Sequence, residues 1–261
     1  MDTDEILARY DRDLREHALP DGPGARVERV GEVVRQVADG HGWNGVLWSR
    51  LDEAGADRAI QDQIARFTAL GQDFEWKLHG HDRPADLGAR LSAAGFRAEP
   101  EETLMIGEID RLDLEAQLPD GVRLMEVTDA AGVDLFVEAS EKAFDTEGTG
   151  LRHRLLAQLA ADPRTVVAFV ALAGDEPVSS ARMEFVPGTP FAGLWGGGTV
   201  EAWRGRGLYR ALVAHRARLA ATRGCRYLQV DALPTSRPIL ERLGFLPLTT
   251  TTPYLYEQQG S

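Results

Sequence analysis

The stretch from Thr199 to Leu212, TVEAWRGRGLYRAL, limits what this chain can fold into more than any other. An apolar run precedes it, Gly205 and Gly207 lie within an arginine-rich turn, and a helical pattern follows over residues 209–223. Glycine allows the backbone to turn so that consecutive N–H groups converge, and a helix that begins there adds unpaired N–H donors and the positive end of its dipole. The sequence therefore predicts a strand–turn–helix unit that holds phosphate or pyrophosphate. An ordinary glycine-rich turn with solvated arginines is the alternative that this motif alone leaves open.

Composition narrows the class of protein and its partners. With 261 residues, 43% hydrophobic and 27% charged, the chain has room for one large or two modest globular domains. We expect a cytoplasmic protein, because the acidic start lacks the pattern of a signal peptide and Cys225 is the single cysteine. The net charge of −12 argues against nucleic acid and favours a cationic substrate such as an amine. We expect no metal and no membrane partner, and a monomer or homodimer.

A polar segment divides the chain. Residues 111–121, RLDLEAQLPDG, carry a proline and a glycine and are typical of a linker. They predict a first domain over residues 1–110 and a second over residues 122–261.

The second domain has the alternating order of an α/β protein with a mixed sheet (α+β in arrangement). Apolar periodicity and turn residues predict strands over residues 122–127, 165–173, 177–186, 191–200, 226–232 and 245–256. They predict helices over residues 129–144 (capped by Asp129), 151–161 and 208–223, and a last helix that Ser236 caps and that ends at Gly244.

The first domain partly repeats this order. Strands are predicted over residues 45–49, 74–79 and 103–109, and helices over residues 58–70 and 84–95. LSAAGF, at residues 91–96, and LERLGF, at residues 240–245, occupy matching places and indicate a weak internal repeat. The turn in the first half, SRLDEAGADR, has no GxG and carries three acids, which would repel pyrophosphate. We therefore expect one working site, in the second half.

With these elements placed, residues 120–258 resemble the GNAT superfamily of acyl-CoA-dependent N-acyltransferases. The family's Q/R-x-x-G-x-G/A loop is matched by Arg204 and Gly207, whereas Tyr209 departs from it in the last small position. The GF pair at Gly244 and Phe245 lies at the family's usual separation from this loop. The first half is similar to a shortened, degenerate GNAT half, so the resemblance implies a fused tandem of two GNAT-like halves.

The resemblance implies acetyl-CoA or another short acyl-CoA as cosubstrate. The pyrophosphate would lie on the backbone N–H groups of the glycine loop, and the strand end at residues 198–200 would pair with the pantetheine amides. The residues expected to bind the cofactor are Gly198, Thr199, Val200, Arg204, Gly205, Arg206, Gly207, Leu208, Tyr209, Arg210, Ser236 and Pro238. The run of three glycines at residues 196–198 independently suggests a bulge or a close approach by another chain.

N-acylation needs a base that frees the amine and donors that stabilise the oxyanion. In the places where family members often carry a glutamate and a tyrosine, this chain has Leu194 and Leu240. The substitutes are Glu184, on the neighbouring strand, Asp231, after a strand, and Tyr209, as donor to a thiolate leaving group. The structural alternatives are a paired strand carboxylate for Glu184, a loop cap for Asp231 and a packed side chain for Tyr209.

Three functions compete. The first is an N-acetyltransferase that transfers an acyl group from acetyl-CoA to a small primary amine by direct attack. The second is an acyl-CoA-binding pseudoenzyme or regulatory module. The third, a dinucleotide-binding enzyme, is weak because the loop lacks a full GxGxxG.

Overall fold

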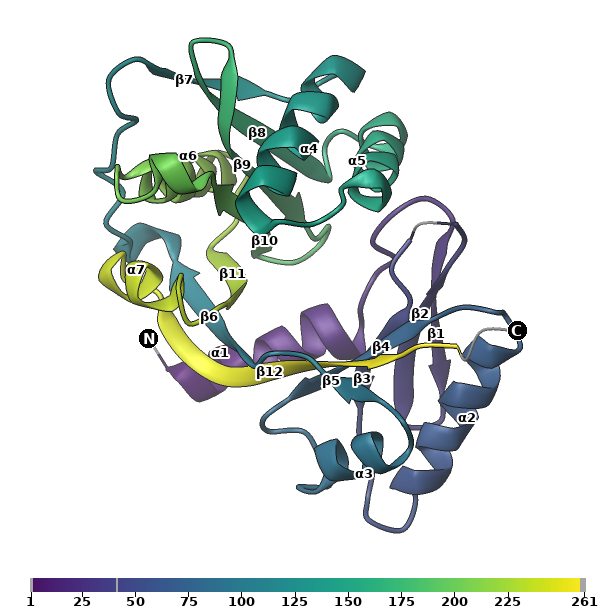
Figure 1. Cartoon of the computed structure of the whole chain (residues 1–261). Coiled ribbons are helices and arrows are strands. Elements are labelled where there is room, and N and C mark those ends of the chain that lie inside the picture. Colours follow the sequence, from purple (N-terminus) through teal and green to yellow (C-terminus); the bar gives the residue numbers. More distant parts are fainter. Residues whose placement is uncertain (1, 41, 259–261) are drawn as a thin grey trace. The chain divides into compact units, whose positions relative to one another are not determined.

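The computed structural model describes residues 2–40 and 42–258 (Figure 1). The chain forms two compact units that are not two consecutive segments. Unit 1 holds the chain up to Leu104, Asp231–Pro234 and the segment from Leu248 onward, and unit 2 holds Met105–Val230 and Thr235–Pro247. Three strands, β6 (Glu102–Glu108), β11 (Tyr227–Ala232) and β12 (Leu246–Tyr256), contribute residues to both units.

These units differ from the predicted division into residues 1–110 and 122–261. The reason is strand β12, whose residues 251–256 pair antiparallel with β4 (Phe74–His79) of unit 1. Pairing between strands so distant in sequence depends on tertiary structure, and no local change in composition marks it. The predicted linker at residues 111–121 lies within unit 2.

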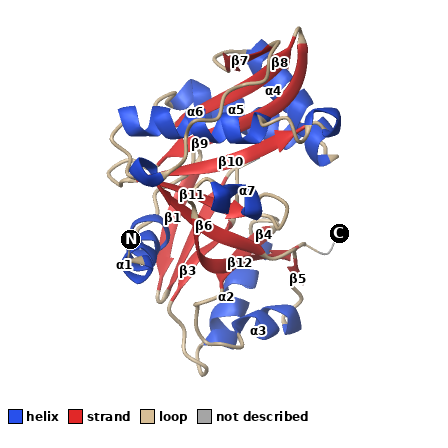
Figure 2. Cartoon of the chain, turned by 90° about the vertical axis from the view of Figure 1, so that its left-hand side faces the viewer, coloured by secondary structure: helices blue, strands red, loops and turns tan. Residues whose placement is uncertain are grey.

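Unit 2 has a mixed sheet with helices on both faces, and Figure 2 distinguishes its helices from its strands. The strand order is β11-β10-β9-β8-β7, in which β10 and β11 are parallel and the other pairs are antiparallel. Its elements are β7 (Val122–Glu126), α4 (Ala130–Phe144), α5 (Thr149–Ala161), β8 (Val166–Ala173), β9 (Glu176–Phe185), β10 (Phe191–Thr199), α6 (Leu208–Thr222) and α7 (Arg237–Arg242).

The two faces of this sheet can be told apart by single contacts. Successive side chains of a strand point to opposite faces. Phe169 of β8 lies against His215 of α6, with 4.7 Å between the ring centroids, so α6 covers that face. Gly198 of β10 faces Ala143 and Phe144 of α4, so α4 covers the other face.

The predicted elements of unit 2 are confirmed to within two or three residues at each end. Asp129 caps α4, and its Oδ1 accepts a hydrogen bond of 2.8 Å from the backbone N–H of Gly132. The continuous apolar run over β8 is buried at all positions but the last, as expected of a strand covered on both faces. Gly174 turns the chain into β9 with φ at 62°.

Unit 1 has the strand order β1-β2-β3-β4-β12, with β5 beside β12. The strands β3 and β4 are parallel, and β1–β2, β2–β3 and β4–β12 are antiparallel. Its elements are α1 (Thr3–Tyr10), a π-helix (Asp11–Glu16), β1 (Ala25–Val30), β2 (Val33–Ala38), β3 (Gly45–Ser49), α2 (Ala56–Thr68), α3 (Leu87–Ala93) and β5 (Arg97–Ala98). The sequence interpretation missed the β1–β2 hairpin, which turns at Gly31 and whose strands, ARVERV and VVRQVA, do not alternate apolar and polar residues.

In the part of the chain that the structure describes, no helix combines the length and the apolar character needed to cross a membrane. Those same residues contain no group of three or more His, Cys, Asp and Glu arranged to hold a metal ion.

Candidate functional site

The candidate site begins where two parallel strands of unit 2 separate. The ladder between β10 and β11 covers three pairs, from Phe191 opposite Tyr227 to Gly193 opposite Gln229. Strand β10 continues to Thr199, so the rest of its edge toward β11 carries no ladder in the described register. Free backbone N–H and C=O groups along a strand edge are suited to an extended, amide-containing ligand.

A bulge interrupts β10 within this unpaired part. From Trp195 to Gly198 the strand advances three residues while β9 advances two, from Arg182 to Ser180. Gly196 has φ at 57°, in the left-handed region that glycine adopts at no steric cost. The bulge predicted from the three glycines is therefore present.

The glycine loop joins the end of β10 to helix α6. Gly205 and Gly207 have φ of 75° and 85°, and no heavy atom lies within 4 Å of the position that a Cβ would take at either residue. Gly207 is the N-cap of α6, and its carbonyl accepts the first helical hydrogen bond, of 3.0 Å, from Ala211 N. The N–H groups of Leu208, Tyr209 and Arg210 are thus free of helical acceptors, at the positive end of the dipole. The loop has the backbone geometry of an anion site.

The arginine side chains of the loop are engaged with the protein. Arg204 donates to the backbone oxygens of Thr199 (3.1 Å) and Ala143 (3.0 Å) and so ties the loop to β10 and α4. The Arg206 guanidinium lies 4.5 Å from the centroid of Trp203. Arg210 forms an ion pair of 3.8 Å with Asp113. The side-chain donors of Arg204 are therefore used within the protein, whereas the backbone N–H groups at the start of α6 have no helical acceptor.

Tyr209 leaves the loop for the interior. It is half-buried and shares a side-chain hydrogen bond with Ser236, and burial raises the pKa of its phenol. A Cβ at Gly197 would lie 3.0 Å from the tyrosine ring, so the ring packs beside the bulge. Ser236 occupies the N-cap position of α7 but makes no capping hydrogen bond, which corrects the prediction that its side chain caps this helix. Pro238 lies in the first turn of α7, as predicted.

Glu184 belongs to a row of residues across three strands. Gly193 is the register partner of both Glu184 on β9 and Gln229 on β11, so the three face the same side of the sheet, toward α4 and α5. The Cβ position of Gly193 lies 2.6 Å from the indole Nε1 of Trp195 and 2.7 Å from the amide Nε2 of Gln229. The glycine thus makes room for two polar side chains between the strands.

Both ends of this row have unused polar capacity. Glu184 Oε1 lies 3.2 Å from Arg182 Nε, near enough for an ion pair but not aligned as a hydrogen bond. It also accepts a long hydrogen bond of 3.4 Å from Gln158 Nε2. At the other end, Gln229 Oε1 is buried with no hydrogen-bond partner among the described residues. Buried acceptors are almost always satisfied, so this oxygen needs a donor from a water or a ligand.

Asp231 lies in unit 1, inside β11 and not after it. Its Oδ2 forms an ion pair with the ammonium of Lys77, and its Oδ1 accepts a hydrogen bond of 3.3 Å from Thr251. The side chain is 3% exposed. Both carboxylate oxygens are therefore engaged, and the residue is a paired strand carboxylate, not the loop cap named as its structural alternative.

The sequence interpretation missed Gln229 and Arg216. Gln229 interrupts the apolar run of a short strand, which gives no signal by itself. The sequence pattern does single out Arg216, because this residue falls on the apolar stripe that Leu208, Leu212 and Ala220 define along α6 at helical spacing. A charge on the buried face of a helix is unusual enough to merit attention.

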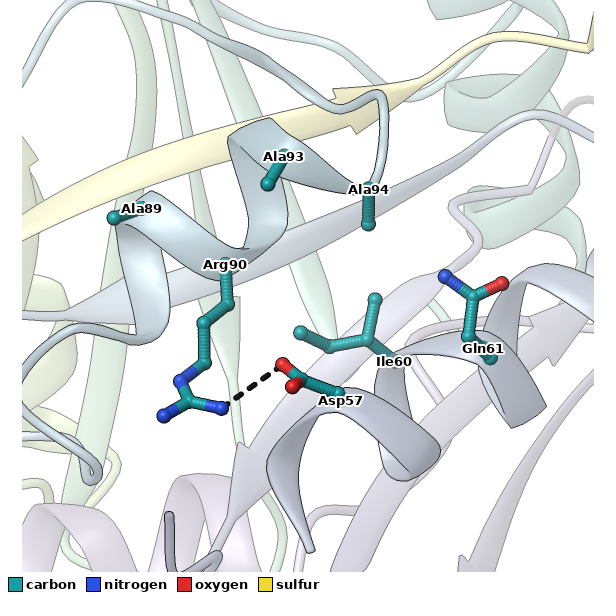
Figure 3. Close-up of a pocket in the computed structure, with 7 residues that line it drawn as sticks. All are labelled: Asp57, Ile60, Gln61, Ala89, Arg90, Ala93 and Ala94. Atoms are coloured by element: carbon teal, nitrogen blue, oxygen red, sulfur yellow. Dashed lines mark hydrogen bonds and ion pairs between the residues drawn. The ribbon is translucent and has the colours of Figure 1, made fainter. Parts of the chain in front are cut away.

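A pocket in unit 1 has a different character. It measures about 430 Å³ and is lined by Asp57, Ile60, Gln61, Ala89, Arg90, Ala93 and Ala94 (Figure 3). Its cation, Arg90, already pairs with Asp57 and Asp86, both at 3.0 Å. Helix α2 contributes Asp57, Ile60 and Gln61 to the pocket. Its N-terminus already has an acidic partner, because the Asp52 carboxylate accepts a hydrogen bond of 2.7 Å from Gly55 N. We therefore place the candidate site in unit 2.

Comparison with known proteins agrees with this geometry. Residues 131–245 match the model of the acetyltransferase (GNAT) family. The fold is similar to that of a GCN5-related N-acetyltransferase from Kribbella flavida (19% identity, TM-score 0.69, 91% of either chain covered). It is also similar to a tandem GNAT protein from the clavulanic acid biosynthesis pathway (16%, TM-score 0.63, 92% of this chain and 85% of that one). A third similar structure is a GCN5-related N-acetyltransferase from Sphaerobacter thermophilus (16%, TM-score 0.60, 97% and 85%).

The comparison with curated proteins gave no match. The family match covers the bulged strand β10, the glycine loop, α6 and the GF pair that follows α7. The solved structures, at identities below 20%, support the same fold over nearly the whole chain. The chain therefore carries, over residues 131–245, an acyltransferase domain of the GNAT family.

Proposed function

We propose that this protein transfers an acetyl or other short acyl group from acetyl-CoA to a small primary amine by direct attack in a ternary complex. One observation carries the proposal: the free edge of β10 runs past a bulge into a glycine loop that opens helix α6. A strand edge that can pair with amides and leads to an anion site matches pantetheine joined to pyrophosphate.

The cofactor would lie along these elements in order. The N–H groups of Gly207, Leu208, Tyr209 and Arg210 are the donors proposed for the pyrophosphate. Residues 198–200, at the end of β10, are proposed to pair with the pantetheine amides. Arg204 would act by holding the loop to β10 and α4, because its side chain donates to Thr199 and Ala143. The thioester then reaches the bulge, beside the row that ends in Glu184.

The chemistry requires two protons to move. The amine arrives as an ammonium ion and must lose one proton before its nitrogen attacks the thioester carbonyl; we assign this step to Glu184. As the C–N bond forms and the C–S bond breaks, the departing thiolate takes the phenol proton of Tyr209, and the second proton of the nitrogen passes to the Tyr209 phenolate and restores it. Glu184 then releases the first proton to water. We assign the proton donor to the hydroxyl of Tyr209, because a phenol has a pKa of about 10 and is protonated at neutral pH; burial raises the pKa of this phenol further. The products are the amide and CoA thiol.

The first half is proposed to be a degenerate GNAT-like half in a tandem. In unit 1, β3, α2 and β4 repeat the parallel strand–helix–strand order of β10, α6 and β11. Gly95 and Gly244 have φ of 100° and 98°, and each precedes a phenylalanine whose N–H bonds back to Leu91 or Leu240. With Asp52 at the start of α2, this half would bind no CoA. A cytoplasmic location and a monomeric or homodimeric state belong to the same proposal.

A thiol-release assay tests the function. Purified protein, acetyl-CoA and a panel of small primary amines should release CoA thiol in proportion to acylated amine, identified by mass. Neutral alcohols of matched size serve as controls and should give background rates. Tight acetyl-CoA binding without turnover of any amine would instead favour the acyl-CoA-binding pseudoenzyme, and binding of NAD in place of CoA would favour the dinucleotide enzyme.

A further inference from the structure

Arg216 is a buried charge that the proposed reaction does not use. Its side chain is 1% exposed, under α6 and against β9. Its Nε donates to Leu212 O (3.1 Å) and its Nη1 to Arg182 O (2.8 Å), so both partners are backbone carbonyls. Across the described ranges of the chain, Arg216 forms no ion pair. Burial lowers its pKa to about 10, the direction expected of a cation taken out of water without a carboxylate beside it.

The remaining nitrogen, Nη2, lies beside the bulge of β10. A Cβ at Gly197 would be 3.6 Å from Arg216 Nη2 and 3.0 Å from Tyr209 Cε2. No hydrogen bond of Nη2 occurs within the part of the chain that the structure describes. Gly197 itself belongs to the residues that widen β10 where β11 has left it. The charged Nη2 donor of Arg216 therefore lies where the thioester of the proposed acyl-CoA would lie.

Packing α6 against β9 does not by itself require a guanidinium with an unused nitrogen. Burying a charge is costly unless it is paired, whereas an apolar side chain at this position would pack between α6 and the sheet. The guanidinium is planar and offers parallel N–H groups that match a carboxylate. Arg216 is thus a buried guanidinium with no carboxylate beside it among the described residues, and its Nη2 is the group that an anionic ligand would meet.

The guanidinium is well separated from the proposed pyrophosphate site. Arg216 lies eight residues into α6 from Leu208, which is about 12 Å along the helix axis at 1.5 Å a residue. A ligand that binds its phosphates at the loop and extends along β10 would present its opposite end, the acyl group, to Arg216. The anion that fits is therefore a carboxylate on the acyl chain.

We propose that Arg216 recognises the terminal carboxylate of a dicarboxylic acyl group, so that the preferred donors are acyl-CoAs of the malonyl or succinyl class. The inference rests on the proposed function, because it presumes that acyl-CoA binds along β10. It changes the expected product from an acetamide to an amide that ends in a carboxylate.

The test compares acyl-CoAs that differ only in that carboxylate. Calorimetric titration of the full chain would use malonyl-CoA against propionyl-CoA and succinyl-CoA against butyryl-CoA, each pair having the same number of acyl carbons. We expect the acidic member of at least one pair to bind at least tenfold more tightly. Arg216→Met should remove that preference while acetyl-CoA still binds. Arg223→Met removes an exposed arginine that follows the same helix and should leave the preference intact.

The outcomes separate the two proposals. If wild-type protein binds none of these CoA thioesters, the proposed function is wrong and this inference falls with it. If acetyl-CoA binds but neither acidic thioester is preferred, only the role of Arg216 is overturned. The wild-type comparison decides this even if Arg216→Met fails to fold. A preference that survives in folded Arg216→Met would also overturn the assignment.

Discussion

At the scale of single residues, backbone groups and side chains have different roles in the candidate site. The two left-handed glycines and the first turn of α6 provide donors for an anion, while Arg204, Arg206 and Arg210 are held by Thr199, Trp203 and Asp113 respectively. Backbone donors keep a fixed geometry, whereas long side chains must lose rotamer freedom to bind. An anion site of this kind therefore depends on the glycines more than on the arginines.

Glu184 is the residue on which the proposed proton transfer depends. Glu184→Gln keeps the shape and the contact with Gln158 but removes the base. We expect kcat to fall about 100-fold, the usual contribution of a general base, with little change in the affinity for acetyl-CoA. Steady-state rates and calorimetric titration would measure the two effects separately.

Glu176→Gln provides the matched control for that experiment. Glu176 is an exposed carboxylate at the start of the same strand, and its replacement should change neither rate nor affinity. An unaltered kcat in Glu184→Gln would remove Glu184 from the mechanism.

We expect the stability of unit 1 to depend on pH because of Glu102. Burial, and next the negative charge of Asp231, raise the pKa of Glu102 to about 7. The folded protein therefore retains a proton that the unfolded chain loses from about pH 4.5 upward, and stability must fall as the pH rises from about 4.5 to 7. Glu102→Gln, which stays neutral, should unfold at a higher temperature than wild type at pH 8, and the difference should vanish near pH 4.5.

Thermal unfolding followed by circular dichroism at several pH values would measure this difference. Glu101→Gln, at an exposed neighbouring position, is the control and should follow the wild-type curve. A constant gap between Glu102→Gln and wild type from pH 4.5 to 8 would contradict the assignment.

At the scale of elements, the packing of α4 on β10 holds the bulged strand in place. A Cβ at Gly198 would lie 2.8 Å from Ala143 Cβ and 2.6 Å from the Phe144 ring. Gly198→Val should therefore force α4 away from β10 and lower the free energy of unfolding by about 1–3 kcal/mol, the usual cost of overpacking. Urea denaturation would show this as a lower midpoint.

Gly150→Ala tests whether such a loss is specific to the bulge. Gly150 lies in the first turn of α5, with no atom within 4 Å of its Cβ position, so alanine should be neutral or slightly stabilising there. A Gly198→Val protein as stable as wild type would mean that α4 does not pack on β10 as described.

The elements themselves could largely be predicted from the sequence, because strong local patterns define them. The buried strand β8, the capped helix α4 and the strand–turn–helix at Gly207 were all expected, and all are present. The β1–β2 hairpin was not recognised, since short strands without alternating apolar and polar residues carry little signal. The pairing of β12 with β4 and the meeting of Glu184, Gly193 and Gln229 are set by register between distant strands, which no local pattern reveals.

Within the site, the sequence identified the glycine loop and the bulge but not the partners of each side chain. Arg204 was expected among the cofactor-binding residues, and this stays a prediction; its donors bond to the backbone oxygens of Thr199 and Ala143, partners that the sequence did not reveal. Ser236 was expected to cap α7, and it bonds to Tyr209 instead. Such contacts depend on which rotamers the surrounding packing allows, and this becomes visible only in three dimensions.

At the scale of the whole molecule, the two units are interwoven along the chain. Asp231–Pro234 and the segment from Leu248 onward belong with the first half, so the predicted catalytic domain, residues 122–261, includes strand material whose partner is β4. A fragment of residues 122–261 would expose the unpaired edge of β12 and lack β6. We expect it to aggregate or to show no cooperative unfolding transition, in contrast to the full chain.

Size-exclusion chromatography and near-ultraviolet circular dichroism of the fragment would check this expectation. A monodisperse fragment that unfolds cooperatively and binds acetyl-CoA would show that the second half is an independent domain.

The central claim is that the glycine loop of unit 2 binds the pyrophosphate of CoA, and calorimetric titration of acetyl-CoA tests it most directly. We predict a dissociation constant on the order of micromolar for wild type, with no binding of NAD. Gly207→Gln and Gly207→Glu share the strain of a side chain at positive φ, about 1–2 kcal/mol, and differ only in charge. Gly207→Gln should retain measurable binding, and Gly207→Glu should abolish it while remaining folded. Absence of acetyl-CoA binding to wild type, or equal binding by the two variants, would contradict the account.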